Sequence, residues 1–132
     1  MTRTVAEIMV TDLVSFKPET NIHKALHTLV ERRISGAPVI DAAGALVGML
    51  SKRDCLKVVF SAAYHQDRGG PVSEYMSSDV QTLEADLDLV SCAKRFLDSP
   101  FRRFPIVRDG QLVGQVSRHD ILKALAQDLK LT

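Results

Sequence analysis

An internal duplication constrains the fold of this chain more than any other feature of its sequence. Residues 5–9 (VAEIM) correspond to residues 72–76 (VSEYM), an offset of 67 positions. Residues 46–54 (LVGMLSKRD) correspond to residues 112–120 (LVGQVSRHD), and here the offset is 66. The residue lost between the copies falls in a turn, where a change in length is best tolerated. This repeat predicts two copies of one supersecondary unit.

Each copy contains the pattern of an amphipathic helix. In the first copy, apolar residues recur at helical spacing between positions 22 and 30, and each has an apolar counterpart 67 positions later. Asn21 and Asp88 directly precede these stripes, where a side-chain oxygen can accept hydrogen bonds from free backbone N–H groups. We therefore predict two equivalent helices with capped N-termini.

Two short strands follow each of these helices, and a final helix closes each copy near Lys52 and Arg118. Asp109 and Gly110 separate the strands of the second pair and are typical of a type I′ hairpin turn. With a short helix and a short strand at the start of each copy, the pattern predicts a mixed α/β (α+β) fold. The expected strands are residues 38–41 and 46–50 in the first copy and 104–107 and 112–116 in the second.

Charge and composition exclude several classes of protein. The 17 basic and 16 acidic residues give a net charge of +1. A protein that mainly neutralises nucleic-acid phosphates needs a strongly basic face, so we do not expect nucleic acid as a partner. No apolar run approaches the roughly 20 residues of a membrane span, and the N-terminus lacks a signal-peptide core. We therefore expect no membrane partner and a cytoplasmic location.

Neither catalysis nor metal binding is expected. The sequence has no nucleophile elbow, Walker loop or Gly-rich dinucleotide motif, so we expect no enzymatic activity. His23 and His27 share a helix face, but no third metal ligand accompanies them. Cys55 and Cys92 lie outside any CxxC motif and are expected to be reduced thiols on buried helix faces.

A Ser-x-x-Asp sequence at the start of each final helix is the main candidate for a site. One interpretation is a capping box, in which Ser and Asp satisfy each other's backbone donors. The other is a ligand site, because a helix N-terminus binds phosphate and a carboxylate accepts both hydroxyls of a ribose. Basic neighbours suit a phosphorylated ligand. The residues are Ser51, Arg53 and Asp54 in the first copy and Ser117, Arg118 and Asp120 in the second.

The segment before the first hairpin strand of each copy is a second candidate. In the first copy small residues dominate, and they either let backbone groups approach a flat base or pack closely at the start of the strand. In the second copy two adjacent arginines could hold phosphates bidentately or remain solvated. The segments are Ile34, Ser35, Gly36 and Ala37, and then Phe101, Arg102, Arg103 and Phe104.

Because these motifs occur in the same order in both copies, the sequence resembles the cystathionine-β-synthase-type (CBS) repeat over about residues 5–125. The resemblance implies two tandem β-α-β-β-α repeats, together a Bateman module, packed sheet to sheet with pseudo-two-fold symmetry. We place the first repeat at residues 5–60, a linker at 61–71 and the second repeat at 72–127.

The resemblance also implies a ligand. In the family, the Asp holds ribose, the Ser lies near phosphate, and the ligand occupies a cleft between the repeats. We therefore expect Ser117 and Asp120 to face Val14 and residues 34–37, and Ser51 and Asp54 to face Val80 and residues 102–104. AMP, ADP, ATP, S-adenosylmethionine, NAD-type ligands and cyclic dinucleotides all remain open as regulatory ligands, and no catalytic cofactor is expected.

The predicted function is a regulatory module that senses an adenosine-containing nucleotide and acts on a partner enzyme or transporter. The alternative is a ligand-free scaffold for dimerisation or for a partner protein. In either case the resemblance implies a homodimer that associates through apolar residues of the final helices. These residues are Leu56, Val59, Ile121, Leu122 and Leu125.

Overall fold

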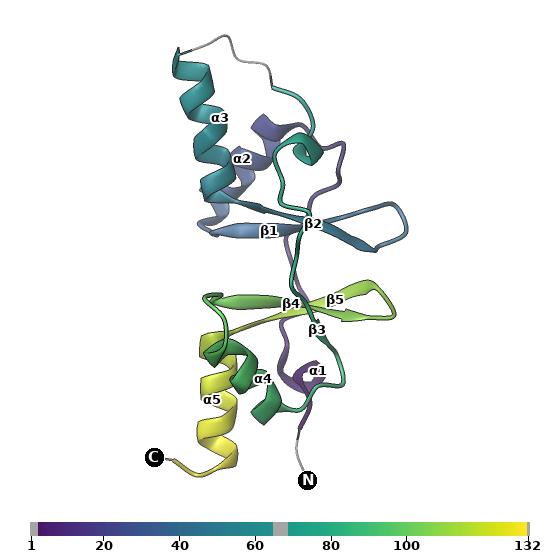
Figure 1. Cartoon of the computed structure of the whole chain (residues 1–132), viewed down its shortest axis with the longest axis vertical. Coiled ribbons are helices and arrows are strands. Elements are labelled where there is room, and N and C mark those ends of the chain that lie inside the picture. The colour runs from purple at the N-terminus through teal and green to yellow at the C-terminus, as the bar shows by residue number, and fades with distance from the viewer. Residues whose placement is uncertain (1–2, 65–68, 132) are drawn as a thin grey trace. The chain divides into compact units, whose positions relative to one another are not determined.

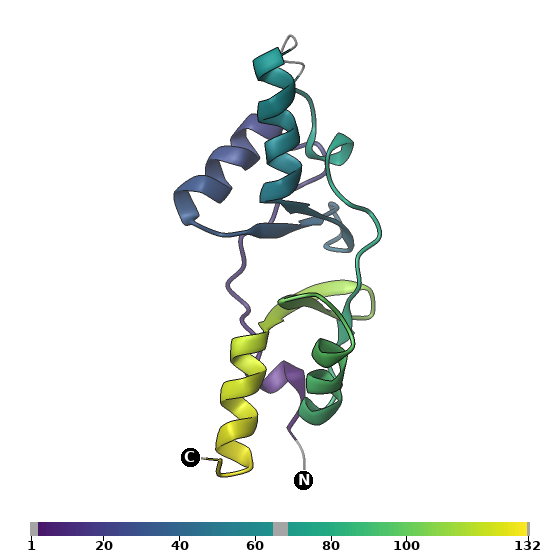
Figure 2. The same cartoon turned by 60° about the vertical axis from the view of Figure 1, so that its left-hand side comes forward.

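The computed structural model describes residues 3–64 and 69–131 and divides the chain into two compact units. The first-copy unit spans Val14–Val80, and the second-copy unit combines the described residues up to Leu13 with those from Gln81 onward. In each unit two helices cover one face of a small sheet (Figures 1 and 2). The chain thus has mixed helix and strand content with two small sheets, as the sequence predicts.

The elements follow the same order in both copies. The first-copy unit contains α2 (Ile22–Arg32), β1 (Gly36–Ile40), β2 (Leu46–Ser51), α3 (Lys52–Tyr64) and the 3-10 helix η1 (Val72–Glu74). The second-copy unit contains α1 (Val5–Ile8), β3 (Leu83–Glu84), α4 (Leu89–Leu97), β4 (Arg103–Arg108), β5 (Gln111–Ser117) and α5 (Arg118–Asp128). Strands β1 and β2 are antiparallel, as are β4 and β5, whereas β3 is parallel to β4.

Each unit completes its sheet with a segment from the other sequence copy. In the first-copy unit, Met49 of β2 pairs with Ser77 through two backbone hydrogen bonds of 2.9 Å. In the second-copy unit, Gln115 of β5 pairs with Val10 through bonds of 2.8 and 2.9 Å. The sequence repeats and the compact units therefore have different boundaries, because the start of each repeat belongs to the other repeat's unit.

This exchange explains why one glycine is repeated in the sequence. A Cβ on Gly114 would lie 2.5 Å from Met9 Sδ and 3.0 Å from Val10 O. A Cβ on Gly48 would lie 2.5 Å from the sulfur of Met76 and 2.9 Å from a backbone oxygen of the same exchanged segment. A real Cβ essentially never comes as close to a backbone oxygen as it would at Gly48, and the contact at Gly114 is tighter than most real ones, so glycine lets the exchanged segment pack against the sheet.

The predicted caps and turn are confirmed. The Asn21 side chain accepts a hydrogen bond of 2.8 Å from the His23 N–H, and Asp88 accepts one of 3.0 Å from the Ser91 N–H. The Ser91 hydroxyl and backbone N–H groups lower the pKa of Asp88 from its usual value. In the β4–β5 turn, Asp109 and the following glycine have φ of 52° and 78°, as a type I′ turn requires.

Helix α3 extends into the segment that the sequence suggests as a linker. It continues through residues 61–64, because alanines 62 and 63 favour a helix and the Phe60 and Tyr64 rings pack one turn apart, 4.9 Å between centroids. Residues 65–68 of the expected linker lie outside the described residues. Pro71 then pairs with Asn21, which brings the chain back against the start of α2.

Each unit has its own hydrophobic core. In the second-copy unit, Phe104 and Ile106 cluster with buried residues of α4 and α5, and in the first-copy unit Val39 and Leu50 cluster with those of α2 and α3. Cys55 and Cys92 are free thiols in these cores, as predicted. Burial is the main cause that raises the pKa of both thiols, to about 11 for Cys92. Both residues therefore stay protonated near neutral pH.

Candidate functional site

Both Ser-x-x-Asp sequences form reciprocal caps at the N-termini of α3 and α5. Ser117 Oγ accepts a hydrogen bond of 3.1 Å from the Asp120 N–H, and Asp120 Oδ2 accepts one of 2.9 Å from the Ser117 N–H. Ser51 and Asp54 repeat these contacts at 3.1 and 2.9 Å. The Ser51 hydroxyl also donates to Asp54 Oδ2 at 3.0 Å. The capping interpretation is therefore correct for both copies.

The caps leave part of each carboxylate available. Capping uses Oδ2 of Asp54 and of Asp120, and among residues 3–64 and 69–131 the Oδ1 atoms have no hydrogen-bond partner. Both side chains are only half-buried. Each turn thus presents a fixed carboxylate oxygen at a helix N-terminus where, among the described residues, the second helical N–H, of Arg53 or His119, has no hydrogen-bond partner. Such an arrangement can accept hydroxyl donors and, at the helix N-terminus, an anionic group.

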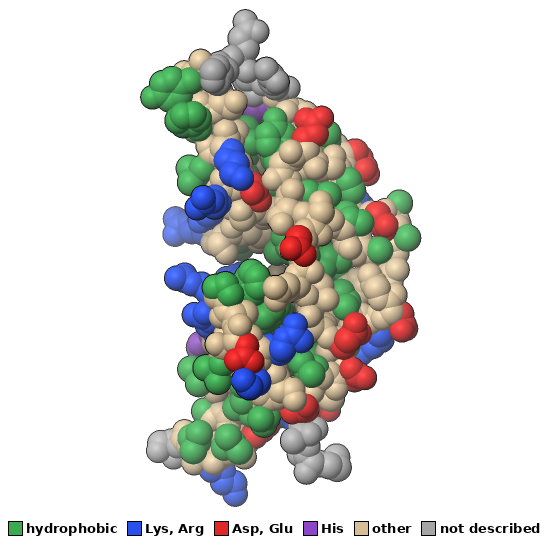
Figure 3. Space-filling view, in the orientation of Figure 1, with side chains coloured by type: hydrophobic (Ala, Val, Ile, Leu, Met, Phe, Trp, Pro, Cys, Tyr) green, Lys and Arg blue, Asp and Glu red, His purple; other side chains and the backbone are tan. Residues whose placement is uncertain are grey.

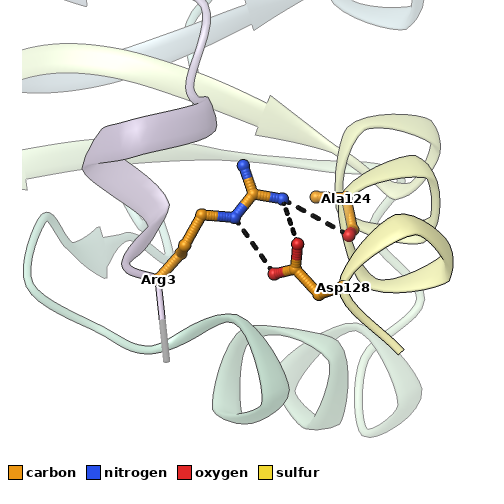
Figure 4. Close-up of polar contacts among 3 residues, drawn as sticks. All are labelled: Arg3, Ala124 and Asp128. Carbon is orange, nitrogen blue, oxygen red and sulfur yellow. Dashed lines mark hydrogen bonds and ion pairs between the residues drawn. The ribbon is translucent and has the colours of Figure 1, made fainter. Parts of the chain in front are cut away.

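A small polar hollow borders Asp120 in the second-copy unit. It has a volume of about 220 Å³ and lies between the N-terminal segment and α5. Arg3 is held at its edge by two bonds to Asp128, 3.0 Å from Nε and 2.7 Å from Nη2, and donates to the Ala124 carbonyl at 3.4 Å (Figure 4). Sequence reasoning missed Arg3 and Lys123, which also lines the hollow. Lys123 lies one helical turn after Asp120, and that spacing is the only signal in the sequence.

The segment before β1 lies against its own copy's turn. The Lys52 N–H donates to the Ser35 carbonyl at 2.8 Å, and Gly36 pairs with Ser51. A Cβ on Gly36 would lie 2.8 Å from Leu50 O, so close packing of the strands accounts for this glycine. Ser35 is exposed, Ile34 is half-buried, and the Ala37 side chain belongs to the core.

The segment before β4 lies in the same way against Ser117. The Arg118 N–H donates to the Arg102 carbonyl at 2.9 Å, and Arg103 pairs with Ser117. In the described part of the chain, neither Arg102 nor Arg103 forms an ion pair. The Phe104 side chain is 1% exposed and packs on Phe96 with ring centroids 4.8 Å apart, so this predicted site residue is a core residue.

Basic side chains gather near both turns. Arg53 is exposed in the first turn of α3, and Arg118 is exposed in the first turn of α5. In the space-filling view, many Lys and Arg side chains lie along the left-hand edge, near the starts of α3 and α5 (Figure 3). Most Asp and Glu side chains lie on the opposite side, toward the hairpin turns. The net charge is near zero, but positive and negative side chains are locally separated within each unit.

The remaining expected site residues, Val14 and Val80, are the two ends of the first-copy unit and are half-buried. The sequence pairs Ser117 and Asp120 with residues 34–37, which belong to the other unit. It likewise pairs Ser51 and Asp54 with residues 102–104. These pairings stay predictions.

Two copies of one capped α/β unit, each completed by the other's first segment, define a tandem-repeat module. The chain belongs to the CBS domain family, whose model matches residues 5–61 and 72–127.

Several known proteins are similar to this chain, and one of them is a CBS-pair protein. A crystal structure of CBSX2 in complex with AMP superposes with a TM-score of 0.81 at 32% identity, covering 96% of this chain and 98% of that one. A second structure, of CBSX2 from Arabidopsis thaliana, gives a TM-score of 0.82 at 29% identity and covers 98% and 99% of the two chains. A 17.7 kDa protein of Acidianus ambivalens is 32% identical over 95% of this chain and 74% of its own length.

Other relatives carry the module within longer chains. This chain spans 43% of a protein from Methanocaldococcus jannaschii and 15% of an A-adding tRNA nucleotidyltransferase from Aquifex aeolicus. Within the described residues, no helix is both long and apolar enough to cross a bilayer. The cytoplasmic location stays a prediction.

Proposed function

We propose that this chain is a regulatory module that binds an adenosine-containing nucleotide at its Ser-x-x-Asp turns and has no catalytic activity of its own. The observation that carries the proposal is the divided use of Asp54 and Asp120. One carboxylate oxygen caps the helix, and the other has no hydrogen-bond partner among the described residues. That second oxygen can accept the ribose hydroxyls, and the helix N-terminus and nearby arginines suit the phosphate.

The similarity to CBSX2 supports the chemical class of this ligand. CBSX2 has been crystallised with AMP, and its chain is 32% identical to this one over nearly the full length. AMP, ADP, ATP and S-adenosylmethionine share the adenosine group, so all of them are candidates. The regulated target is a partner enzyme or transporter.

A second candidate function is ligand-free self-association, and exposed apolar side chains on the final helix of each unit favour it. Leu56, Phe60 and Leu122 are 66%, 64% and 70% exposed. Hydrophobic side chains gather over the end of α3 and along α5 (Figure 3). Burial of such a surface stabilises a homodimer, and light scattering of the purified chain tests it. The sequence also predicts Ile121 among these association residues. That prediction is wrong, because Ile121 is only 4% exposed and lies in the core.

The test of nucleotide binding is a thermal-shift titration with AMP, ADP, ATP and S-adenosylmethionine. A ligand at a hundredfold excess over its Kd adds about 2.7 kcal/mol to the free energy of unfolding, which raises Tm by several degrees. Asp120→Asn keeps an oxygen that can cap α5 but removes the charge. It should lose about 1.5–3 kcal/mol of binding, the contribution of a charged hydrogen bond.

Asp88→Asn is the matched control, because Asp88 caps α4 in the same unit and lies outside both Ser-x-x-Asp turns. It should leave the ligand-induced increase in Tm unchanged. If Asp120→Asn and Asp54→Asn both retain the full increase, the ligand binds elsewhere. If no nucleotide raises the Tm of the wild-type protein, self-association becomes the better description.

A further inference from the structure

The helices that precede the two pre-strand segments end differently. Helix α2 ends at Arg32 and is capped by Arg33, whose φ of 54° is left-handed and whose N–H donates to the carbonyls of Leu29 and Val30. The position 67 residues later is Pro100. Proline cannot adopt a positive φ and has no N–H, so the same cap is impossible there. Helix α4 accordingly ends earlier, at Leu97.

The second copy therefore has a longer connection between helix and strand. Residues 33–35 link α2 to β1, whereas residues 98–102 link α4 to β4. Because β4 begins 67 positions after β1, the whole difference comes from the shortened helix. This longer segment carries Arg102 directly before the strand.

Arg118 holds this longer connection in place. Its Nε donates to the Phe101 carbonyl at 3.1 Å, its Nη2 donates to the Pro100 carbonyl at 3.5 Å, and its backbone N–H donates to the Arg102 carbonyl at 2.9 Å. One residue thus contacts three consecutive carbonyls. The counterpart in the first copy, Lys52, makes only the backbone contact, to Ser35, among the described residues.

We propose that Arg118 is a positioning residue that fixes residues 100–102 so that Arg102 and Arg103 lie beside the Ser117–Asp120 turn, rather than a direct phosphate ligand. The inference rests on the proposed nucleotide-binding function. A guanidinium presents several N–H donors in one plane and can bond two carbonyls together, whereas an ammonium cannot reproduce that fork. The guanidinium therefore fixes the connection that follows α4, while the Asp98 N–H caps the helix itself.

Arg118→Lys and Arg118→Met separate the two roles. Lysine keeps the charge and loses the fork, whereas methionine loses both. If Arg118 positions the loop, both variants should raise the Kd for AMP and ATP by about tenfold, the lower end of what orienting residues contribute at metal sites. Both should also accelerate hydrogen exchange of the residue 118 amide by about tenfold in the free protein. Arg108→Lys, at the far end of β4, is the control and should change neither quantity.

Several outcomes would overturn the proposal. If Arg118→Lys keeps the wild-type Kd while Arg118→Met weakens binding and lowers its salt dependence, Arg118 contacts phosphate directly. Unchanged hydrogen exchange in both variants would show that the side chain does not hold the loop. Faster exchange with an unchanged Kd would show that the loop position does not matter for the ligand. If the wild-type protein binds none of AMP, ADP, ATP and S-adenosylmethionine, the proposed function itself fails, and the wild-type titration shows this before any variant is made.

Discussion

Beside its Ser-x-x-Asp turn, the first-copy unit presents the small, neutral residues Ser35 and Gly36 after a short connection. The second-copy unit presents Arg102 and Arg103 at the same place, and its connection is longer. The two backbone hydrogen bonds of each cap have equal lengths in both units. The glycine that admits the exchanged segment is also shared. The duplicated chain has thus kept its framework and changed the residues beside the framework. Two sites built on such units would differ in charge and in size.

The core provides the sharpest contrast between the units, and disrupting it should have the largest effect. Phe104 corresponds to Ala37, and both are 1% exposed. Phe104→Ala removes the ring that packs on Phe96 and should destabilise the second-copy unit by about 3–5 kcal/mol. Phe101→Ala should cost far less, because Phe101 is 39% exposed.

Urea denaturation measures this difference for each unit. Both tyrosines of the chain, Tyr64 and Tyr75, belong to the first-copy unit, so tyrosine fluorescence follows that unit while circular dichroism follows both. In Phe104→Ala the dichroism transition should begin at a lower urea concentration than the fluorescence transition. Coincident transitions would show that the two units unfold as one.

The exchanged segments should contribute equally to the two units. Gly48→Ala and Gly114→Ala each force a Cβ against a methionine sulfur and a backbone oxygen, and each should cost about 1–3 kcal/mol by overpacking. Gly110→Asn is the control, because Gly110 has no neighbour within 4 Å and asparagine tolerates its positive φ. Urea midpoints measure all three. A cost at only one of the two glycines would show that the exchange is unequal.

The caps of α2 and α4 should differ in their response to acid, and this is the smallest expected effect. The pKa of Asp88 is lowered in the folded chain, so its stabilising contribution is present above the unfolded pKa near about 3.9. That contribution is lost as the pH falls through the lower, folded pKa. Asn21 does not titrate. Asp88→Asn should therefore reduce the acid dependence of Tm between about pH 5 and 2, and Asn21→Asp should increase it.

Local features were predictable from the sequence because their causes are local. The caps at Asn21 and Asp88 and the turn at Asp109 depend on residues within three positions of one another. The exchange of edge segments could not be predicted from the sequence, because the partner of Val10 depends on pairing across most of the chain. The Gly and Met residues that recur in both copies contact each other in this exchange, but the sequence does not show which copy each of them contacts.

The candidate site also combines features that could be predicted from the sequence with features that could not. Ser117 and Asp120 could be found from a four-residue motif, and their mutual hydrogen bonds follow from helix geometry. The contacts of Arg118 could not be predicted from the motif, because they depend on where α4 ends. Pro100 determines where α4 ends. Its fixed φ and missing N–H would have allowed this earlier end to be predicted from the sequence.

The exchange of edge segments also affects how the chain is made. Translation releases residues 14–80 as one continuous run, so the first-copy unit has all its strands once Ser77 has left the ribosome. The segment that contains Arg3 and Val10 is made earlier but must wait for β5 and α5, and Arg3 and Asp128 lie 125 positions apart. Meanwhile it is an unpaired edge that can join the β5 strand of a neighbouring chain on the same messenger RNA. Crowded polysomes should therefore favour domain-swapped chains.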